Sequence, residues 1–151
     1  MGGDRFPTGI QRRRGVADLQ DVESAKRLKA ENFRLKTSGL VFASSTRCRE
    51  EAEAVCRWLD SLVLLMPVSE QRKPYERSVK TELLLDALDH ALHFSDDVGV
   101  GFPHSTQTSP AFLLEISRKC DELGANRIFI YDTNGSADPF SIFHLIRDLK
   151  N

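Results

Sequence analysis

Four short apolar runs recur along the chain at intervals of about 25 to 35 residues, and none of them alternates between apolar and polar positions. Continuous apolarity over about 4 to 8 residues is typical of a strand that is buried on both faces, as in a parallel sheet. The sequence therefore predicts four parallel strands, at residues 39–43, 61–68, 98–102 and 127–131.

Helical periodicity surrounds these runs. Apolar residues three or four positions apart form single stripes, namely Leu19, Val22, Ala25 and Leu28, then Ala52, Val55, Cys56 and Leu59, then Leu84, Ala87, Leu88 and Ala91. Two further helices are marked by Ser109-Pro110 and Asp138-Pro139, which place a capping side chain before a proline, and Gly124 ends the first of them. This order predicts an α/β fold, either a small open sheet or part of an eight-stranded barrel, and periodicity alone does not separate the two.

Composition narrows the class of partner. The chain has 151 residues, 40% of them hydrophobic, which suits one globular domain. A formal charge of −1 argues against nucleic acid and anionic membranes, and no apolar stretch approaches the ~18 residues that span a bilayer. Three cysteines without a C-x-x-C pair, and a start without a secretory apolar core, predict a cytoplasmic protein with no signal peptide or lipid anchor.

Polar residues follow the strand at 127–131: the chain reads Asp132-Thr133-Asn134-Gly135 before the next helix. Ligands of parallel α/β proteins bind at the carboxyl ends of the strands, where side chains leave the packed sheet and helix N-termini offer unpaired N–H groups. This turn is our leading candidate site. The alternative is that Asp132 and Thr133 only cap a loop through side-chain to backbone hydrogen bonds.

The histidines are further candidates for proton transfer or metal binding. His104 follows the strand at 98–102 and can exchange a proton near neutral pH, although a plain loop histidine is the simpler interpretation. His90 and His93 lie three residues apart on one predicted helix without an evident third metal ligand, so we interpret them as surface residues beside Asp86 and Asp89. The run Arg12–Arg14 is interpreted as a solvated loop rather than a phosphate clamp.

The stretch from Gly124 to Pro139 reads Gly-Ala-Asn-Arg-Ile-Phe-Ile-Tyr-Asp-Thr-Asn-Gly-Ser-Ala-Asp-Pro, and the final helix ends in Leu-Ile-Arg-Asp-Leu. It resembles the sixth strand and helix of the metal-dependent lyase and acyltransferase TIM-barrel family that contains isopropylmalate synthase, homocitrate synthase and hydroxymethylglutaryl-CoA lyase, the pyruvate carboxyltransferase domain. Residues 101–110, 66–73 and 39–43 resemble its fifth, fourth and third strands, and Phe6-Pro7 the tail of the second. The resemblance implies a partial (β/α)8 barrel over residues 18–151, preceded by an N-terminal segment at 1–17.

By this resemblance, the family activity is condensation of an acyl-CoA with a 2-oxo acid, as in homocitrate or isopropylmalate synthesis, or the related lyase cleavage. Thr133 would hydrogen-bond the substrate carboxylate, and Asp132 would hold the turn of the same substrate site. His104 stands where family members often have a Glu, which makes it the candidate catalytic residue. The family also implies a divalent metal ion, Zn, Mg or Mn, acting as a Lewis acid on the 2-oxo acid.

Two family motifs are missing. The sequence contains no Arg-Asp-Gly and no His-x-His, the motifs that supply the family's catalytic Arg and its metal ligands, so we assign no metal ligand to this chain. We therefore expect no activity from the chain alone, and association with another copy or with a companion barrel fragment. A noncatalytic binding or regulatory module and a truncated remnant are the alternatives, and the sequence leaves open whether the chain is an enzyme.

Overall fold

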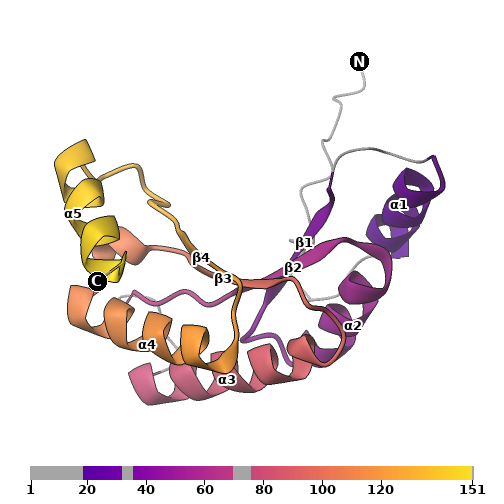
Figure 1. Ribbon diagram of the computed structural model, residues 1–151, viewed down its shortest axis with the longest axis horizontal. Coiled ribbons are helices and arrows are strands. Elements are labelled where there is room, and N and C mark those ends of the chain that lie inside the picture. The colour runs from indigo at the N-terminus through magenta and orange to yellow at the C-terminus, as the bar shows by residue number, and fades with distance from the viewer. Residues whose placement is uncertain (1–18, 32–35, 70–75, 151) are drawn as a thin grey trace.

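The computed structural model describes residues 19–31, 36–69 and 76–150, so the expectations for residues 1–17 lie outside the described residues. Helices and strands alternate as the sequence predicts (Figure 1). The helices are α1 Leu19–Ala30, α2 Cys48–Trp58, α3 Arg77–Leu92, α4 Pro110–Leu123 and α5 Pro139–Lys150, and a 3-10 turn, η1, covers Ser105–Gln107. The strands are β1 Ser38–Phe42, β2 Ser61–Leu65, β3 Val98–Phe102 and β4 Arg127–Ile130.

The four strands form one parallel sheet in the order β1-β2-β3-β4, which confirms the predicted α/β class. The second strand is shorter than predicted and ends at Leu65. Pro67 has no N–H to continue the ladder, although Met66 still donates to the carbonyl oxygen of Gly101 at 3.0 Å. The sheet curves, with α2, α3 and α4 on its convex side and α1 and α5 at its two ends (Figure 1).

Helix ends follow the predicted signals at two of three places. Gly124 ends α4 in the left-handed conformation, with a φ of 111°, which suits a residue without a Cβ. Asp138 caps α5, because its Oδ1 accepts from the N–H groups of Phe140 and Ser141 at 2.9 and 3.0 Å. The predicted side-chain cap at Ser109 is wrong: Ser109 makes no such bond, and Pro110 begins α4 while Leu113 N–H donates to the Ser109 carbonyl oxygen.

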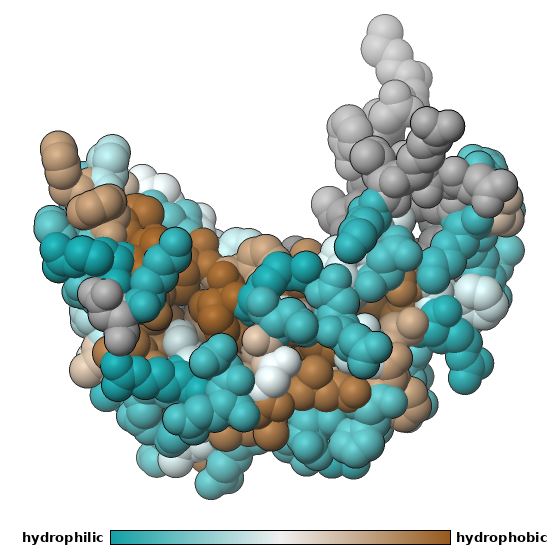
Figure 2. All heavy atoms as spheres, viewed as in Figure 1, coloured by the Kyte–Doolittle hydropathy of each residue, from teal (hydrophilic) through white to brown (hydrophobic). Residues whose placement is uncertain are grey.

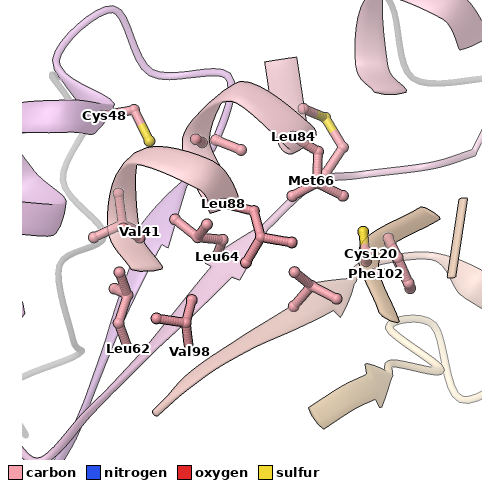
Figure 3. Close-up of a cluster of buried hydrophobic side chains, with 14 of the residues drawn as sticks. Val41, Cys48, Leu62, Leu64, Met66, Leu84, Leu88, Val98, Phe102 and Cys120 are labelled. Carbon is pink, nitrogen blue, oxygen red and sulfur yellow. The ribbon is translucent and has the colours of Figure 1, made fainter. Parts of the chain in front are cut away.

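The hydrophobic core lies between the convex face of the sheet and α2, α3 and α4 (Figure 3). Alternate strand residues such as Val41, Leu64 and Val100 are fully buried there against Leu84 and Leu88 of α3. Cys48, Cys56 and Cys120 are free thiols on the helix side, as expected of small hydrophobic residues. Burial raises the pKa of the Cys120 thiol to about 12 and, with help from Glu51 and Asp86, that of Cys48 to about 11.

The concave face is built differently, because two glycines in β3 leave space for the aromatic rings of Phe129 in β4 and of Tyr131 just after it. A Cβ on Gly99 would lie 2.8 Å from Phe129 Cε2, and one on Gly101 would lie 2.7 Å from Tyr131 Cε2. Tyr131 follows β4 directly, and its ring lies beside Leu65 of β2. The apolar residues gather in a hollow between α5 and the middle of the sheet (Figure 2).

Candidate functional site

The candidate site forms where β3 and β4 end side by side. Phe102 is the register partner of Ile130, so the loops that begin at Pro103 and Tyr131 leave the same edge of the sheet together. This brings His104 next to Thr133, which are 29 residues apart in sequence. The predicted location of the Asp132-Thr133 turn, at the carboxyl end of a parallel strand, is confirmed.

Hydrogen bonds tie the two loops into one unit. His104 N–H donates to Thr133 Oγ1 at 2.9 Å, and Ser105 N–H donates to the Tyr131 carbonyl oxygen at 3.2 Å. The Ser105 hydroxyl donates to the Phe102 carbonyl oxygen and accepts from Tyr131 N–H at 3.2 Å. Because backbone groups make most of these bonds, the position of the Thr133 hydroxyl is set by main-chain geometry rather than by flexible side chains.

The Asp132 carboxylate is hydrogen-bonded to both loops. Its Oδ2 accepts from Ala137 N–H at 2.9 Å, and its Oδ1 accepts from the Thr106 hydroxyl at 2.7 Å. These two hydrogen bonds, the Ala137 N–H first, lower the pKa of the Asp132 carboxyl below its ordinary value. Each carboxylate oxygen therefore already has a partner within the protein.

Thr133 is exposed, whereas the neighbouring Asp132 is half-buried. Its oxygen accepts from His104 N–H, and a hydroxyl that accepts one hydrogen bond still has its own hydrogen to donate. This exposed residue thus keeps one hydroxyl hydrogen to donate at the carboxyl edge of the sheet. A carboxylate, which only accepts hydrogen bonds when ionised, is the complementary group.

His104 is not an exposed loop histidine. The residue is 8% exposed, and its Nδ1 is enclosed without a hydrogen-bond partner among the described residues. Its backbone is left-handed, with a φ of 62°, a conformation that costs a residue with a Cβ about 1 to 2 kcal/mol. Such an outlier next to a candidate ligand group is the kind of local strain that clusters at functional sites.

The sequence interpretation missed Ser105 and Thr106, which connect the β3 loop to Tyr131 and Asp132. Hydroxyl residues in the loop that follows a buried parallel strand are the signal that marks them. It also missed Lys80 of α3, which is 4% exposed and donates to the Ser69 carbonyl oxygen at 2.8 Å beyond the end of β2. Burial lowers the pKa of the Lys80 ammonium group.

A comparison with protein families identifies the family of this chain. The family model described as HMGL-like matches residues 15–151, which is most of the chain and includes both loops of the site. The chain belongs to the HMGL-like family. The members of this family fold as TIM barrels, so the four alternating βα units described here are part of an HMGL-like (β/α)8 barrel.

Curated relatives of this HMGL-like chain are synthases by name. The homocitrate synthase AksA of Methanothermobacter thermautotrophicus is 27% identical over 96 residues, 61% of this chain and 25% of the relative. A 2-isopropylmalate synthase of Sulfurisphaera tokodaii is 30% identical over 95 residues, 60% of this chain and 25% of the relative. One of Methanocaldococcus jannaschii is 24% identical over 139 residues, 89% of this chain and 26% of the relative. The chain spans about a quarter of the length of these relatives.

HMGL-like proteins generally use a divalent metal ion, and the described residues do not fit one. Within residues 19–31, 36–69 and 76–150, no group of three His, Cys, Asp or Glu side chains is placed to hold a metal. The two helical histidines are engaged separately: His90 Nε2 lies 3.1 Å from Glu53 Oε1, and His93 Nδ1 lies 2.7 Å from the Asp89 carbonyl oxygen. Asp86, which the sequence interpretation placed beside these histidines, forms an ion pair with Arg49 of α2 at 2.7 Å.

No helix within the described ranges is long and apolar enough to cross a bilayer.

Proposed function

We propose that this chain forms the substrate-carboxylate half of an HMGL-like active site, of the kind that condenses an acyl-CoA with a 2-oxo acid or cleaves a related acid. The proposal rests on one observation: Thr133 is an exposed residue at the carboxyl end of β4, and its hydroxyl oxygen is fixed by His104 N–H. The names of the relatives, homocitrate synthase and 2-isopropylmalate synthase, support 2-oxo acids as the substrate class.

In this proposal each residue has a limited role. Thr133 donates its hydroxyl hydrogen to the carboxylate of the 2-oxo acid. Asp132 belongs to the substrate site because it holds the loop that carries Thr133, through Thr106 and the Ala137 N–H. His104 positions Thr133 through its main chain, and its imidazole is the candidate proton donor or acceptor. Polarisation of the substrate carbonyl is left to groups outside the described residues, since those residues do not fit a metal.

Ligand-induced stabilisation tests the carboxylate site directly. A ligand that binds the folded chain at ten times its Kd stabilises it by about 1.4 kcal/mol. We expect 2-oxoglutarate or 2-oxoisovalerate to raise the Tm of the wild type and of Thr133→Ser, which keeps the hydroxyl. Thr133→Val, which removes the hydroxyl at similar volume, should lose the shift. Equal shifts in the Ser and Val variants would refute the assignment of Thr133.

Catalysis requires a separate measurement. The purified folded chain is mixed with acetyl-CoA, a panel of 2-oxo acids and zinc, magnesium or manganese, and release of the CoA thiol is followed. We expect no turnover from the chain alone. Turnover that a chelator abolishes would show that the chain completes a metal site by itself, which contradicts a half-site role. Ligand binding without turnover also matches the alternative of a noncatalytic 2-oxo acid binding module.

A further inference from the structure

An aromatic ring covers aliphatic side chains on the concave face of the sheet. Val63 and Leu65 of β2 lie on this face, because the residues that alternate with them point into the core on the helix side. Both are nevertheless almost fully buried, at 3% and 4% exposure. Gly101 of β3 has no side chain, and the Tyr131 ring lies over it beside Leu65. Tyr131 is itself half-buried, so it covers the aliphatic residues and remains partly accessible.

Tyr131 also lies next to the candidate site, and its main chain is fixed there. It is the last residue before the Asp132-Thr133 turn, at the carboxyl end of a barrel strand, where substrates bind. Its N–H donates to the Ser105 hydroxyl at 3.2 Å, and its carbonyl oxygen accepts from Ser105 N–H at 3.2 Å. Two residues of extended chain span at most about 7 Å. The ring is therefore within reach of the remainder of a short acid whose carboxylate is bound at Thr133.

The surroundings of this ring are apolar. The two aliphatic residues beside it carry no charge, and neither does Phe129, whose ring centroid lies 6.4 Å from that of Tyr131. Arg127, at the other end of β4, forms an ion pair with Asp97. An ionised carboxylate that loses its water against such a surface gains no partner in exchange, whereas an apolar group is stabilised by the same contact.

Lys80 is a cation near the same edge of the sheet, but it comes from the opposite face. It belongs to α3, which lies on the convex side (Figure 1). It is 4% exposed, and its Nζ donates to the Ser69 carbonyl oxygen at 2.8 Å. A second carboxylate of a ligand on the concave face would have to displace this hydrogen bond to pair with Lys80. The arrangement therefore favours an acid with a single carboxylate.

We propose that the Tyr131 ring is a specificity-determining contact of this site, and that it selects 2-oxo acids with a short apolar side chain over dicarboxylic 2-oxo acids. Thr133 holds the carboxylate, and the apolar side chain lies against the ring. Each methylene that the ring takes out of water should tighten binding about 4-fold. The inference rests on the proposed function, because it requires the carboxylate to be bound at Thr133.

Calorimetric titration of the full chain with three acids measures this preference. Pyruvate, 2-oxoisovalerate and 2-oxoglutarate share the 2-oxo acid group and differ in the remainder of the molecule. We expect 2-oxoisovalerate, whose side chain has two more carbon atoms than that of pyruvate, to bind about 15-fold more tightly than pyruvate. 2-Oxoglutarate should bind about 10-fold or more weakly than 2-oxoisovalerate, because its second carboxylate meets no cation on the concave face.

Two substitutions separate the ring from its hydroxyl group. Tyr131→Phe keeps the ring and should keep both ratios of Kd, and loss of the preference in this variant would overturn the role of the ring. Tyr131→Gln removes the ring at similar length, and both ratios should fall to about 3-fold or less. The matched control is Phe94→Gln, which removes an aromatic ring that is 51% exposed between α3 and β3 and should change neither ratio. A general loss of stability weakens the binding of all three acids alike and leaves the ratios unchanged.

Equal Kd values for 2-oxoisovalerate and 2-oxoglutarate would overturn the proposed selection, as would unchanged ratios in Tyr131→Gln. A preference for 2-oxoglutarate that Lys80→Met abolishes would assign the dicarboxylic class instead. Failure of the carboxylate site is seen separately, because 2-oxoisovalerate would then bind Thr133→Ser and Thr133→Val with the same Kd. Ratios near one, together with a Kd that depends on the Thr133 hydroxyl, would leave the carboxylate site intact and refute only the role of Tyr131.

Discussion

Substitution of Gly101 by alanine tests the aromatic packing on the concave face of the sheet. The added Cβ would lie 2.7 Å from Tyr131 Cε2, 2.8 Å from Leu65 Cδ2 and 3.4 Å from Val63 Cγ1. Carbon atoms in good contact lie about 3.5 to 4.0 Å apart, so two of these contacts are clashes. Leu65 and Val63 are almost fully buried, whereas Tyr131 is half-buried and can move.

Two opposing terms set the magnitude. Replacing glycine by alanine at an ordinary backbone conformation stabilises a protein by about 0.4 to 1 kcal/mol through the unfolded chain. Overpacking a filled site costs about 1 to 3 kcal/mol. We therefore expect Gly101→Ala to lower the free energy of unfolding by about 1 to 2 kcal/mol. Urea denaturation followed by circular dichroism and by the fluorescence of the single Trp58 measures this change.

A double-mutant cycle identifies the ring as the cause. Tyr131→Leu removes the nearest clashing atom, so the penalty of Gly101→Ala should fall by about 1 kcal/mol in that background. Gly135→Ala is the control, because its φ of 62° strains alanine while no atom lies within 4 Å of the new Cβ. The penalty of this control should be the same in the wild-type and in the Tyr131→Leu backgrounds. A penalty for Gly101→Ala that is equal in both backgrounds would show that the Tyr131 ring does not lie over Gly101.

Three further predictions concern the cap, the thiols and the strained histidine. Asp138→Ala should destabilise α5 by about 0.5 to 2 kcal/mol, seen as faster amide hydrogen exchange within that helix, and unchanged exchange would contradict the cap. At pH 8, Cys48 should react with a thiol reagent about 100-fold and Cys120 about 1000-fold more slowly in the folded chain than in urea, because burial raises the pKa of the two thiols to about 11 and about 12 and so keeps them protonated. Comparable rates in the folded chain and in urea would disprove their burial. His104→Gly should be about 1 kcal/mol more stable than His104→Ala in urea denaturation, because glycine adopts a positive φ without strain, and the reverse order would rule out the left-handed backbone.

The sequence predicts the order of the elements well because each strand is a continuous apolar run and each helix carries one apolar stripe. It also predicts the Asp132-Thr133 turn, since polar residues that follow a buried strand must leave the sheet at its carboxyl end. These signals are local, and each lies within one element. Pro67, which shortens β2, was itself visible in the sequence and could have corrected the strand end.

Pairings between distant segments could not be predicted in the same way. Which carboxylate pairs with His90 depends on how α2 and α3 pack. In the structure His90 pairs with Glu53, and Asp86 forms an ion pair with Arg49 of α2. The contact of His104 with Thr133 depends on strand register, which one sequence does not specify. The left-handed backbone of His104 has no sequence signal either, because glycine is the residue normally expected there.

The sequential strand order has a consequence for how the chain folds. Ser38 pairs with Ser61, Leu62 with Val98 and Gly99 with Arg127, so every pairing closes a loop of roughly 20 to 40 residues. Closure entropy differs by only about 0.5 kcal/mol across such lengths and so imposes no order of assembly. We therefore expect the best-buried pair, β2 with β3, to be the folding nucleus, and the other βα units to add to it on both sides. The β4–α5 unit should accordingly be the last to form and the first to open, which keeps it able to exchange its neighbours long after the centre has become rigid.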